Sequence, residues 1–224
     1  MISKDLPKPE KMKILVVEDH ELTMGGTIEV LQRQYPEAQI RTAQTQQSTL
    51  EQVETFQPDL VIMDLSIPEV SGKTAKTETG IKLLRTVMQQ YPDLNLVVLS
   101  TYVNALVRIN HEIDEHKGGF TVVDKGFSSQ DMLTRVDWAF QGLTHTKDLN
   151  MPGGEVKPEW LEVLILAFQE GLQDKAIAER MQITTRTVLH YWTKIRDVLG
   201  VYPEEGKNLR IQTEMRAREE GFID

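Results

Sequence analysis

Short apolar runs alternate with segments of helical spacing over the first two thirds of the chain. Four of the apolar runs read as buried strands and a weaker one as a fifth, and they span residues 14–17, 39–43, 60–63, 96–99 and 120–123. Each is followed by a segment whose apolar residues recur three or four positions apart, as in an amphipathic helix. This alternation is typical of a parallel sheet covered on both faces. We therefore predict an α/β fold, doubly wound and flavodoxin-like, with five parallel strands.

The pattern changes near residue 150. Residues 142–158 are rich in glycine, proline and polar residues, which is typical of a linker. Beyond them only helical spacing occurs, over residues 160–170, 174–181, 184–199 and about 208–220. The predicted organisation is an N-terminal tail (1–12), an α/β domain (13–143), a linker (144–157) and a second, all-α domain (158–224).

Composition narrows the function classes. The chain has 224 residues, of which 40% are hydrophobic and 26% charged, and it contains no cysteine. The absence of cysteine excludes a disulfide scaffold, a thiolate metal site and a cysteine nucleophile, and it fits a reducing compartment. The sequence has neither an apolar run of membrane-spanning length nor the apolar core of a signal peptide. We therefore predict a cytoplasmic protein that does not contact membranes.

Charged and hydroxyl side chains occur where the predicted strands end. Glu18 and Asp19 follow the first strand, Asp64 the third, Ser100 the fourth and Lys125 the fifth. The carboxyl ends of parallel strands form one crevice in a doubly wound sheet, so we expect these groups to lie together. Three clustered carboxylates require a cation, and hard oxygen ligands suit Mg²⁺.

This combination of groups suits phosphoryl transfer. A carboxylate can act as the nucleophile and form an acyl phosphate. A metal ion and an ammonium group then neutralise the phosphoryl oxygens, and little further covalent chemistry is needed. The alternative is that acidic residues at strand ends only cap helices, which explains single cases better than five groups at matching positions.

Residues 13–143 resemble the receiver domain of bacterial two-component response regulators. The resemblance rests on four motifs: residues 14–20, residues 64–68 with Gly72, Leu99-Ser100, and Lys125-Gly126. It implies that a sensor histidine kinase phosphorylates Asp64. It also implies that Mg²⁺ is bound by Glu18, Asp19, Asp64 and the carbonyl of Ser66, and that the phosphate is sensed by Ser100 and Lys125.

Two features depart from the receiver pattern. Receivers usually carry an aromatic residue or histidine three positions before the lysine, as a switch coupled to the hydroxyl residue, whereas this chain has Val122. In addition, residues 73–79 intervene between Gly72 and Gly80-Ile81, where the third helix would normally begin. This insertion either alters access to the phosphorylation site or is a tolerated surface insertion.

Other enzyme motifs are incomplete. Ser71-Gly72-Lys73-Thr74 imitates the end of a phosphate-binding P-loop, but Ile67 stands where that loop needs its first glycine. The chain has neither a nucleophile elbow nor a dinucleotide-binding glycine motif. We therefore predict that it is not an enzyme.

The all-α region contains a helix-turn-helix pattern. Asp174 is a candidate cap for a short helix, and Gln182-Ile183 would form a tight turn before a second helix capped by Thr184. Gly200 ends that second helix. Its apolar residues fall on one broad face: Val188, Tyr191, Trp192, Ile195 and Leu199. Two short helices joined by a tight turn are typical of DNA-binding proteins.

Residues 158–224 resemble the DNA-binding domain of the LuxR/NarL/FixJ class of regulators. The closest matches are Gly171-Leu172, Lys175, residues 177–181, Thr184, Thr187-Val188, Ile195 and Leu199-Gly200. The resemblance implies that the second helix of the motif enters the major groove of promoter DNA. The residues offered to DNA would be Arg186, Thr187, Leu189, His190, Thr193 and Lys194. The last helix of relatives forms a dimer contact, so a homodimer is expected for the active protein.

The charge of the second domain leaves two hypotheses open. From Met151 onward there are 10 basic and 13 acidic residues, a net charge of −3 within a chain of net charge −9. Residues 171–200 alone carry five basic and three acidic residues, a net of +2, and Leu189 stands where the family commonly has lysine. Because phosphate neutralisation supplies most non-specific affinity, a monomer should bind DNA weakly. The chain is therefore either a phosphorylation-controlled DNA-binding regulator or a regulator whose helix-turn-helix docks proteins, such as RNA polymerase.

Overall fold

The computed structural model describes residues 11–146 and 156–223. Most of the predicted tail (residues 1–10) and the middle of the predicted linker (residues 147–155) lie outside the described residues. The predicted domain limits therefore stay predictions, whereas the elements on either side of them are described.

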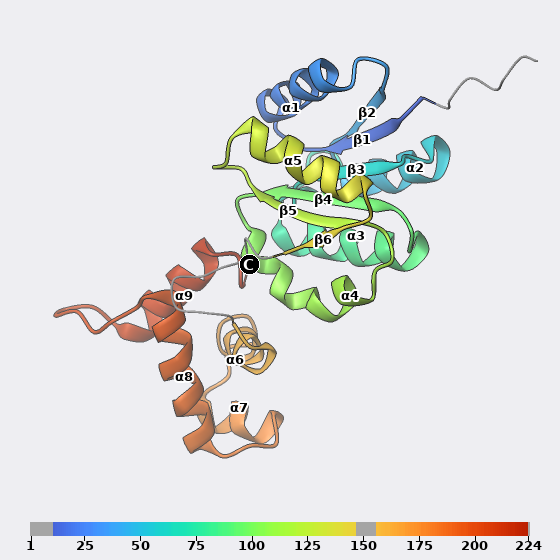
Figure 1. The fold of residues 1–224 in the computed structure, drawn as a ribbon. Coiled ribbons are helices and arrows are strands. Elements are labelled where there is room, and N and C mark those ends of the chain that lie inside the picture. Colours follow the sequence, from blue (N-terminus) through green and yellow to red (C-terminus); the bar gives the residue numbers. More distant parts are fainter. Residues whose placement is uncertain (1–10, 147–155, 224) are drawn as a thin grey trace, which may run out of the picture.

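The first part of the chain forms one parallel sheet (Figure 1), with the strand order β2-β1-β3-β4-β5-β6. The strands are β1 (Lys13–Val17), β2 (Gln39–Ala43), β3 (Leu60–Met63), β4 (Asn95–Ser100), β5 (Phe120–Asp124) and β6 (Thr144–His145). The prediction of an α/β parallel fold is confirmed, but the prediction of five strands is wrong. The sixth strand lies in the predicted linker and pairs with Phe120 and Thr121 of β5. Its two residues are polar, so no hydrophobic run marks it.

Helices cover both faces of this sheet. Those that follow the strands are α1 (Glu21–Gln34), α2 (Gln46–Phe56), α3 (Thr77–Gln90), the 3₁₀ helix η1 (Val103–Ile109), α4 (Asn110–Glu115) and α5 (Ser129–Phe140). Helices α1 and α5 pack on one face, and α2, α3, η1 and α4 pack on the other. The strand order reverses between β1 and β3, where a crevice forms at the carboxyl ends.

Burial on both faces explains the continuous apolar runs. In β1, Ile14 and Val16 pack into one hydrophobic cluster, whereas Leu15 and Val17 pack into the other. Every residue of β3 is buried. The edge strand β2 is mostly exposed, which accounts for its weak hydrophobic signal.

Two helical segments differ from their predicted form. Residues 106–113 have helical spacing, yet they are divided between η1 and α4. Val103, Leu106 and Ile109 lie three positions apart and are all buried, which matches the three-residue turn of a 3₁₀ helix. Helix α3 begins at Thr77, so the last three residues of the predicted 73–79 insertion form its first turn.

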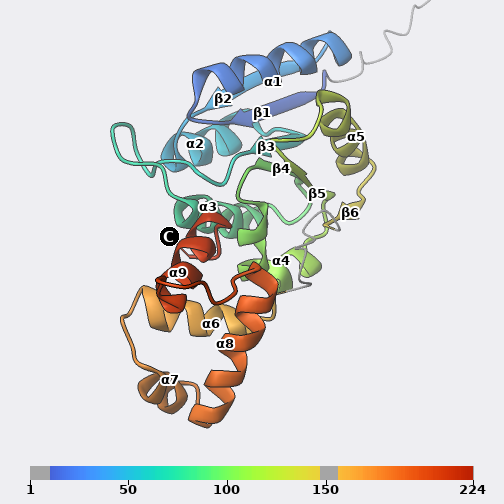
Figure 2. The same ribbon diagram turned by 90° about the vertical axis from the view of Figure 1, so that its left-hand side faces the viewer.

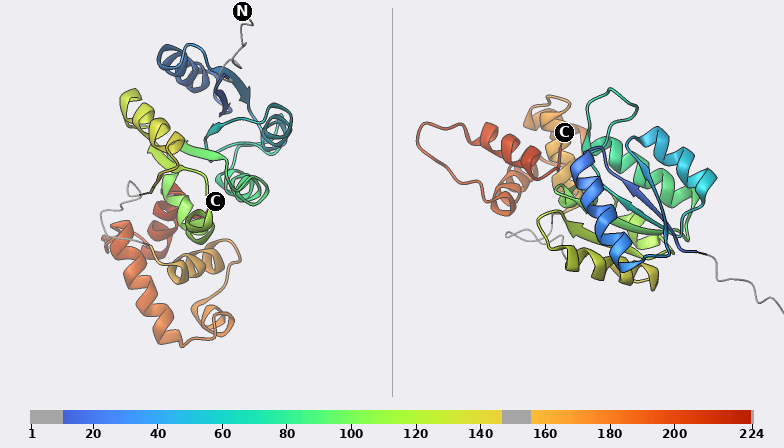
Figure 3. Two further views of the ribbon diagram at one scale, coloured as in Figure 1. Left: turned by 45° about the vertical axis from the view of Figure 1, so that its right-hand side comes forward. Right: turned by 90° about the horizontal axis from the view of Figure 1, so that it is seen from above.

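The C-terminal part is entirely helical and has its own hydrophobic cluster. Its helices are α6 (Pro158–Phe168), α7 (Asp174–Arg180), α8 (Thr185–Leu199) and α9 (Leu209–Glu219). Figure 2 shows α9 beside α3, and the connection between α8 and α9 extends away from both parts (Figure 3). In the described part of the chain, no helix has the length and apolar character needed to cross a membrane.

Candidate functional site: an acidic cluster at the sheet edge and an exposed helical face

The register of the central strands places the first two acidic groups side by side. Val17 of β1 is opposite Met63 of β3, so Glu18 and Asp64 leave the two strands at the same level. The amide N–H of Asp64 donates to the carbonyl of Val17 at 2.9 Å, and that of Glu18 donates to Ala43 at 3.0 Å. The sheet ladder therefore fixes both backbones at the carboxyl edge, as the sequence predicted.

Lys125 joins these two carboxylates. Its Nζ lies 2.6 Å from Glu18 Oε2 and 2.7 Å from Asp64 Oδ2. Glu18 and Asp64 are only 3% and 4% exposed, so both negative charges need a counter-charge inside the protein. Burial, the largest single effect, lowers the pKa of Lys125, but the hydrogen bonds to Asp64 and Glu18 and the attraction of their negative charges together raise this pKa above the ordinary lysine value.

Asp19 and His20 extend the cluster toward solvent. Ligand atoms of Glu18, Asp19 and His20 lie within 4.8 Å of one another. Among the described residues, Asp19 Oδ1 is a buried oxygen without a hydrogen-bond partner, although His20 Nδ1 lies 2.8 Å away. A buried carboxylate oxygen without a hydrogen-bond partner, with the Glu18 carboxylate within 4.8 Å, fits a hard divalent cation. The sequence prediction did not assign a role to His20.

Ser66 and Ser100 flank the acidic cluster. The Ser66 N–H donates to Asp64 Oδ1 at 3.2 Å. Ser100 is fully buried, and its carbonyl accepts the backbone N–H of Lys125 at 3.3 Å, which ties the end of β4 to the residue after β5. The structure thus brings together Glu18, Asp64 and Lys125 by direct contact, with the other predicted residues at the same edge.

Val122 lies in the core rather than at the site. It is fully buried and pairs with Val98 of β4. The nearest aromatic residue along the chain from Ser100 is Tyr102, whose N–H donates to Ser100 Oγ at 3.1 Å. Sequence reasoning did not single out Tyr102, although its position two residues after Ser100 was a usable signal.

The loop between β3 and α3 forms a wall beside the acidic cluster. Ile67 and Lys76 pair as an isolated antiparallel bridge that closes the loop. The carbonyls of Pro68 and Glu69 accept the first N–H groups of α2. A polar cavity of about 590 Å³ lies between this loop, α2 and Asp19. The part of the loop that precedes the predicted insertion is therefore anchored to α2 and borders Asp19.

The helix-turn-helix has the predicted turn but a different first cap. Gln182 adopts a left-handed backbone conformation with φ of 56°, and Thr184 Oγ1 accepts the N–H of Thr187 at 3.1 Å. The prediction that Asp174 caps α7 is wrong, because Gln173 occupies the cap position without a side-chain hydrogen bond. Asp174 Oδ1 instead accepts from Trp192 Nε1 at 2.9 Å, which fastens α7 to α8.

The predicted DNA-contact residues do not all share one environment. Arg186, Leu189, His190 and Thr193 are exposed on α8, and Leu189 is 53% exposed. The other two are half-buried: the Thr187 hydroxyl contacts Thr184 Oγ1 at 2.8 Å, and Lys194 Nζ lies 4.0 Å from Asp197. The opposite face of α8 is buried, as predicted, so the exposed face remains accessible to a partner.

The acidic cluster and its sheet match a known family. The response regulator receiver domain model matches residues 14–137, more than half of the chain. The chain belongs to the response regulator receiver family. This membership confirms the predicted resemblance of the first domain.

Similar proteins carry the names of transcriptional regulators. YhcZ of Bacillus subtilis, an uncharacterized transcriptional regulatory protein, is 34% identical over 91 residues, which cover 41% of this chain and 39% of YhcZ. The match to the transcriptional regulatory protein DegU of Brevibacillus brevis covers 36% of that protein. DevR/DosR of Mycobacterium tuberculosis, a DNA-binding transcriptional activator, is 24% identical over 203 residues. This match covers 85% of this chain and 89% of DevR/DosR.

Solved structures share the whole architecture of the receiver and its helical partner. A structure of two RcsB dimers bound to two parallel DNAs has a TM-score of 0.63 at 19% identity, covering 93% of this chain and 98% of RcsB. RcsB of Salmonella enterica serovar Typhimurium, bound to promoter rprA in the presence of the phosphomimetic BeF3⁻, has a TM-score of 0.57 at 17% identity. The match covers 93% of this chain and 99% of that RcsB chain. A third structure, that of the two-component response regulator RcsB in complex with DNA, has a TM-score of 0.61 at 19% identity. These similarities confirm the predicted fold of a receiver followed by an all-helical domain.

Proposed function

We propose that the chain is a two-component response regulator. Its receiver (residues 13–143) would accept a phosphoryl group from a sensor histidine kinase on Asp64, and its helical domain (residues 158–224) would bind promoter DNA. The observation that carries the proposal is the contact of Lys125 with both Glu18 and Asp64 at the carboxyl edge of the sheet. Transcription in bacteria takes place in the cytoplasm, which is where we place the protein.

The chemistry follows from the side chains present. An oxygen of the Asp64 carboxylate would attack phosphorus, the bond from phosphorus to the donor nitrogen would break, and the donor imidazole would keep its electron pair. Lys125 would pair with the phosphoryl oxygens, and the Ser100 hydroxyl would donate a hydrogen bond to one of them. Glu18, Asp19, Asp64 and the Ser66 carbonyl would hold Mg²⁺, which supplies further neutralisation of phosphoryl charge.

The output is proposed to be DNA binding rather than protein docking. The exposed face of α8 carries Arg186, and the turn and cap of a helix-turn-helix are intact. Related proteins are named as transcriptional regulators, and RcsB has been solved on DNA. These names also favour a regulator over an enzyme. Leu189 could contact a thymine methyl group, which makes its apolar side chain compatible with groove readout.

Dimerisation would compensate for the low positive charge of the helical domain. Ile211 and Met215 of α9 are 56% and 58% exposed, and residues four apart share one helix face. We infer that this apolar pair meets its counterpart in a second copy on DNA. Two linked recognition helices raise affinity without added charge, because the second contact becomes intramolecular.

Substitutions on the exposed face of α8 test the proposed output. Arg186→Ala and Lys194→Ala should each weaken binding to a promoter fragment and reduce the slope of log affinity against log salt by about 1. Arg33→Ala removes an exposed arginine from α1 and should leave both quantities unchanged. Titration of labelled fragments at several salt concentrations measures the slopes. Absence of any salt-dependent binding by the phosphorylated wild type would favour the protein-docking alternative instead.

A further inference from the structure

His20 turns its ring back toward the acidic cluster instead of capping helix α1. It occupies the N-cap position of α1 with an extended backbone, but its side chain makes no hydrogen bond to the first turn. Serine, threonine, aspartate and asparagine usually fill this position, because their short side chains accept hydrogen bonds from those N–H groups. Capping therefore does not explain a histidine here, and its contacts are with Glu18 and Asp19.

The imidazole meets both carboxylates through one nitrogen. His20 Nδ1 lies 3.2 Å from Glu18 Oε1 and 2.8 Å from Asp19 Oδ1. The first contact has hydrogen-bond geometry. The second does not, and Asp19 Oδ1 is, within the described part of the chain, a buried oxygen without a hydrogen-bond partner. A buried polar atom of this kind is commonly satisfied by a water molecule or an ion.

The second oxygen of Glu18 is engaged elsewhere. Glu18 Oε2 lies 2.6 Å from Lys125 Nζ, and the same ammonium group lies 2.7 Å from Asp64 Oδ2. Lys125 therefore neutralises one oxygen of each of these two carboxylates. Glu18 Oε1 is not part of that contact and stays with the imidazole of His20 and the carboxylate of Asp19.

The spacing of these three atoms suits one small divalent cation. Glu18 Oε1, Asp19 Oδ1 and His20 Nδ1 belong to a group of ligand atoms that lie within 4.8 Å of one another. Neighbouring ligands of an octahedral ion with bonds of about 2.1 Å stand about 3 Å apart. His20 Nδ1 has this separation from both carboxylate oxygens. One nitrogen and two oxygens on three consecutive residues can thus take adjacent positions around one ion.

A nitrogen ligand changes which cation the group prefers. Mg²⁺ binds oxygen and keeps several of its waters, so it gains little from an imidazole. Imidazole suits first-row transition ions, whose affinity for nitrogen and oxygen ligands rises from Mn²⁺ through Co²⁺ to Cu²⁺. The chain has no cysteine, so no thiolate competes for such an ion. Two carboxylates with one imidazole therefore favour a transition ion over Mg²⁺.

We propose that His20 is a direct ligand of the cation in the acidic cluster, and that its imidazole gives the receiver a preference for a first-row transition ion, such as Co²⁺, over Mg²⁺. The proposal rests on the proposed function, because it concerns the cation that assists phosphorylation of Asp64. It keeps the oxygen ligands named there and adds one nitrogen to them.

Calorimetric titration of the untagged full chain with Co²⁺ and, separately, with Mg²⁺ measures this preference. The wild type should bind Co²⁺ more tightly than Mg²⁺. His20→Ala should weaken Co²⁺ binding about tenfold or more, because a nitrogen ligand is lost. The same variant should change Mg²⁺ binding by about twofold or less, because water replaces the imidazole at little cost. Asp19→Asn removes an anionic oxygen and should weaken the binding of both ions.

Pulsed electron paramagnetic resonance of bound Mn²⁺ detects the imidazole directly. The manganese spectrum of the wild type should show coupling to a nitrogen nucleus, and that of His20→Ala should lack it. His20→Asn is a second variant in case His20→Ala fails to fold, because asparagine favours the N-cap position of α1. It should lose the nitrogen coupling as well, since its amide offers an oxygen to the ion.

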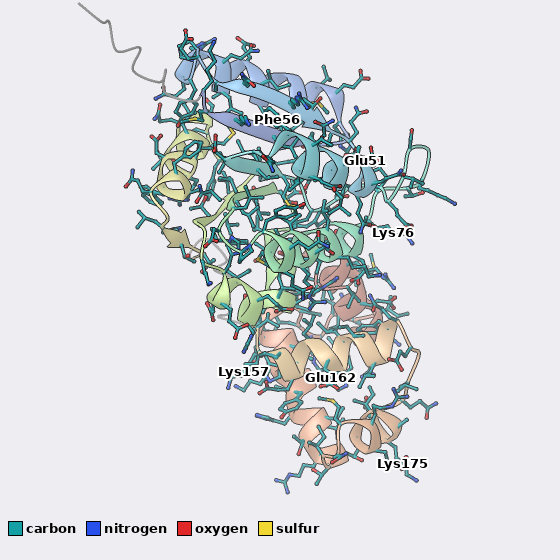
Figure 4. The ribbon with its side chains drawn as sticks, turned by 90° about the vertical axis from the view of Figure 1, so that its right-hand side faces the viewer. Glu51, Phe56, Lys76, Lys157, Glu162 and Lys175 are labelled. Carbon is teal, nitrogen blue, oxygen red and sulfur yellow. The ribbon has the colours of Figure 1, made fainter. Side chains whose placement is uncertain are left out.

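Two control variants test whether the effect is confined to the acidic cluster. His111→Ala removes an exposed histidine whose Nδ1 lies 3.4 Å from Glu115 Oε2. Glu162→Gln removes an exposed carboxylate from α6, in the helical part of the molecule (Figure 4). Both should bind Co²⁺ and Mg²⁺ as the wild type does. A loss of Co²⁺ affinity in His111→Ala as large as that in His20→Ala would overturn the proposal.

Three results would overturn the role given to His20. The first is a wild type that binds Mg²⁺ as tightly as Co²⁺. The second is an equal loss of affinity for both ions in His20→Ala, which would mean that the ring only holds the carboxylates in place. The third is nitrogen coupling that persists in His20→Ala.

Labelling of Asp64 by acetyl phosphate in the same samples distinguishes this proposal from the proposed function. Labelled wild type whose Co²⁺ affinity is unchanged by His20→Ala would overturn the nitrogen ligand and leave the proposed function intact. A wild type that is not labelled on Asp64 would overturn the proposed function, even if Co²⁺ binding depends on His20.

Discussion

Replacing Asp64 with Asn is expected to abolish labelling of the protein by acetyl phosphate. The amide has no anionic oxygen to attack phosphorus, and it cannot share a divalent cation in the way a carboxylate does. The fold should persist, because the amide oxygen can still accept the Ser66 N–H that Asp64 Oδ1 accepts now. Radioactive or mass-spectrometric labelling of the purified variant, together with its circular dichroism spectrum, measures both expectations.

Asp59→Asn is the matched control. Asp59 stands at the opposite end of β3, where its carboxylate accepts the backbone N–H of Lys13 at 2.7 Å. The change is chemically identical but lies at the amino edge of the sheet, so labelling should proceed as in the wild type. Undiminished labelling of the Asp64→Asn variant would assign the acceptor to another residue.

Replacing Gly80 with Ala is expected to destabilise the receiver by about 3 kcal/mol or more. A Cβ at this position in α3 would lie 2.0 Å from the carbonyl oxygen of Leu65 and 2.6 Å from its carbonyl carbon. Those atoms belong to the backbone that follows Asp64, so no side-chain rotation relieves the clash. The helix must shift away from the site. Urea unfolding followed by circular dichroism measures the loss.

Gly26→Ala makes the same chemical change but is expected to stabilise the protein rather than destabilise it. Gly26 is exposed within α1, and nothing lies within 4 Å of the position its Cβ would take. Alanine is a better helix former than glycine, so this variant should gain roughly 0.5–1 kcal/mol. Equal stability of the two variants would contradict the close packing of α3 on the β3 end.

The central strands and their acidic ends were predictable because each has a local cause. Residues 14–17 and 60–63 are apolar throughout since both of their faces are buried. Glu18 and Asp64 directly follow these strands, so a parallel arrangement alone is enough to predict that both lie at the carboxyl edge of the sheet. The Thr184 cap was predictable for a similar reason, since its hydrogen bond reaches only three residues along the chain.

The features that escaped prediction depend on distant contacts. Strand β6 exists because Thr144 and His145 reach the edge of β5, and two polar residues carry no periodic signal. Asp174 looks like a helix cap in sequence, but Trp192 and Arg210, 18 and 36 residues away, hold its carboxylate instead. The contact of Arg108 with Gly221 spans 113 residues, so no local pattern indicates it.

The most direct test of the acidic cluster as a phosphorylation site is to map the phosphoryl group on the wild-type chain. After incubation with acetyl phosphate, tandem mass spectrometry should find one phosphoryl group, located on Asp64, and a chelator should suppress its formation. A phosphoryl group on any other residue, or labelling that is unaffected when divalent cations are removed, would contradict a magnesium-dependent acceptor built from Glu18, Asp19 and Asp64.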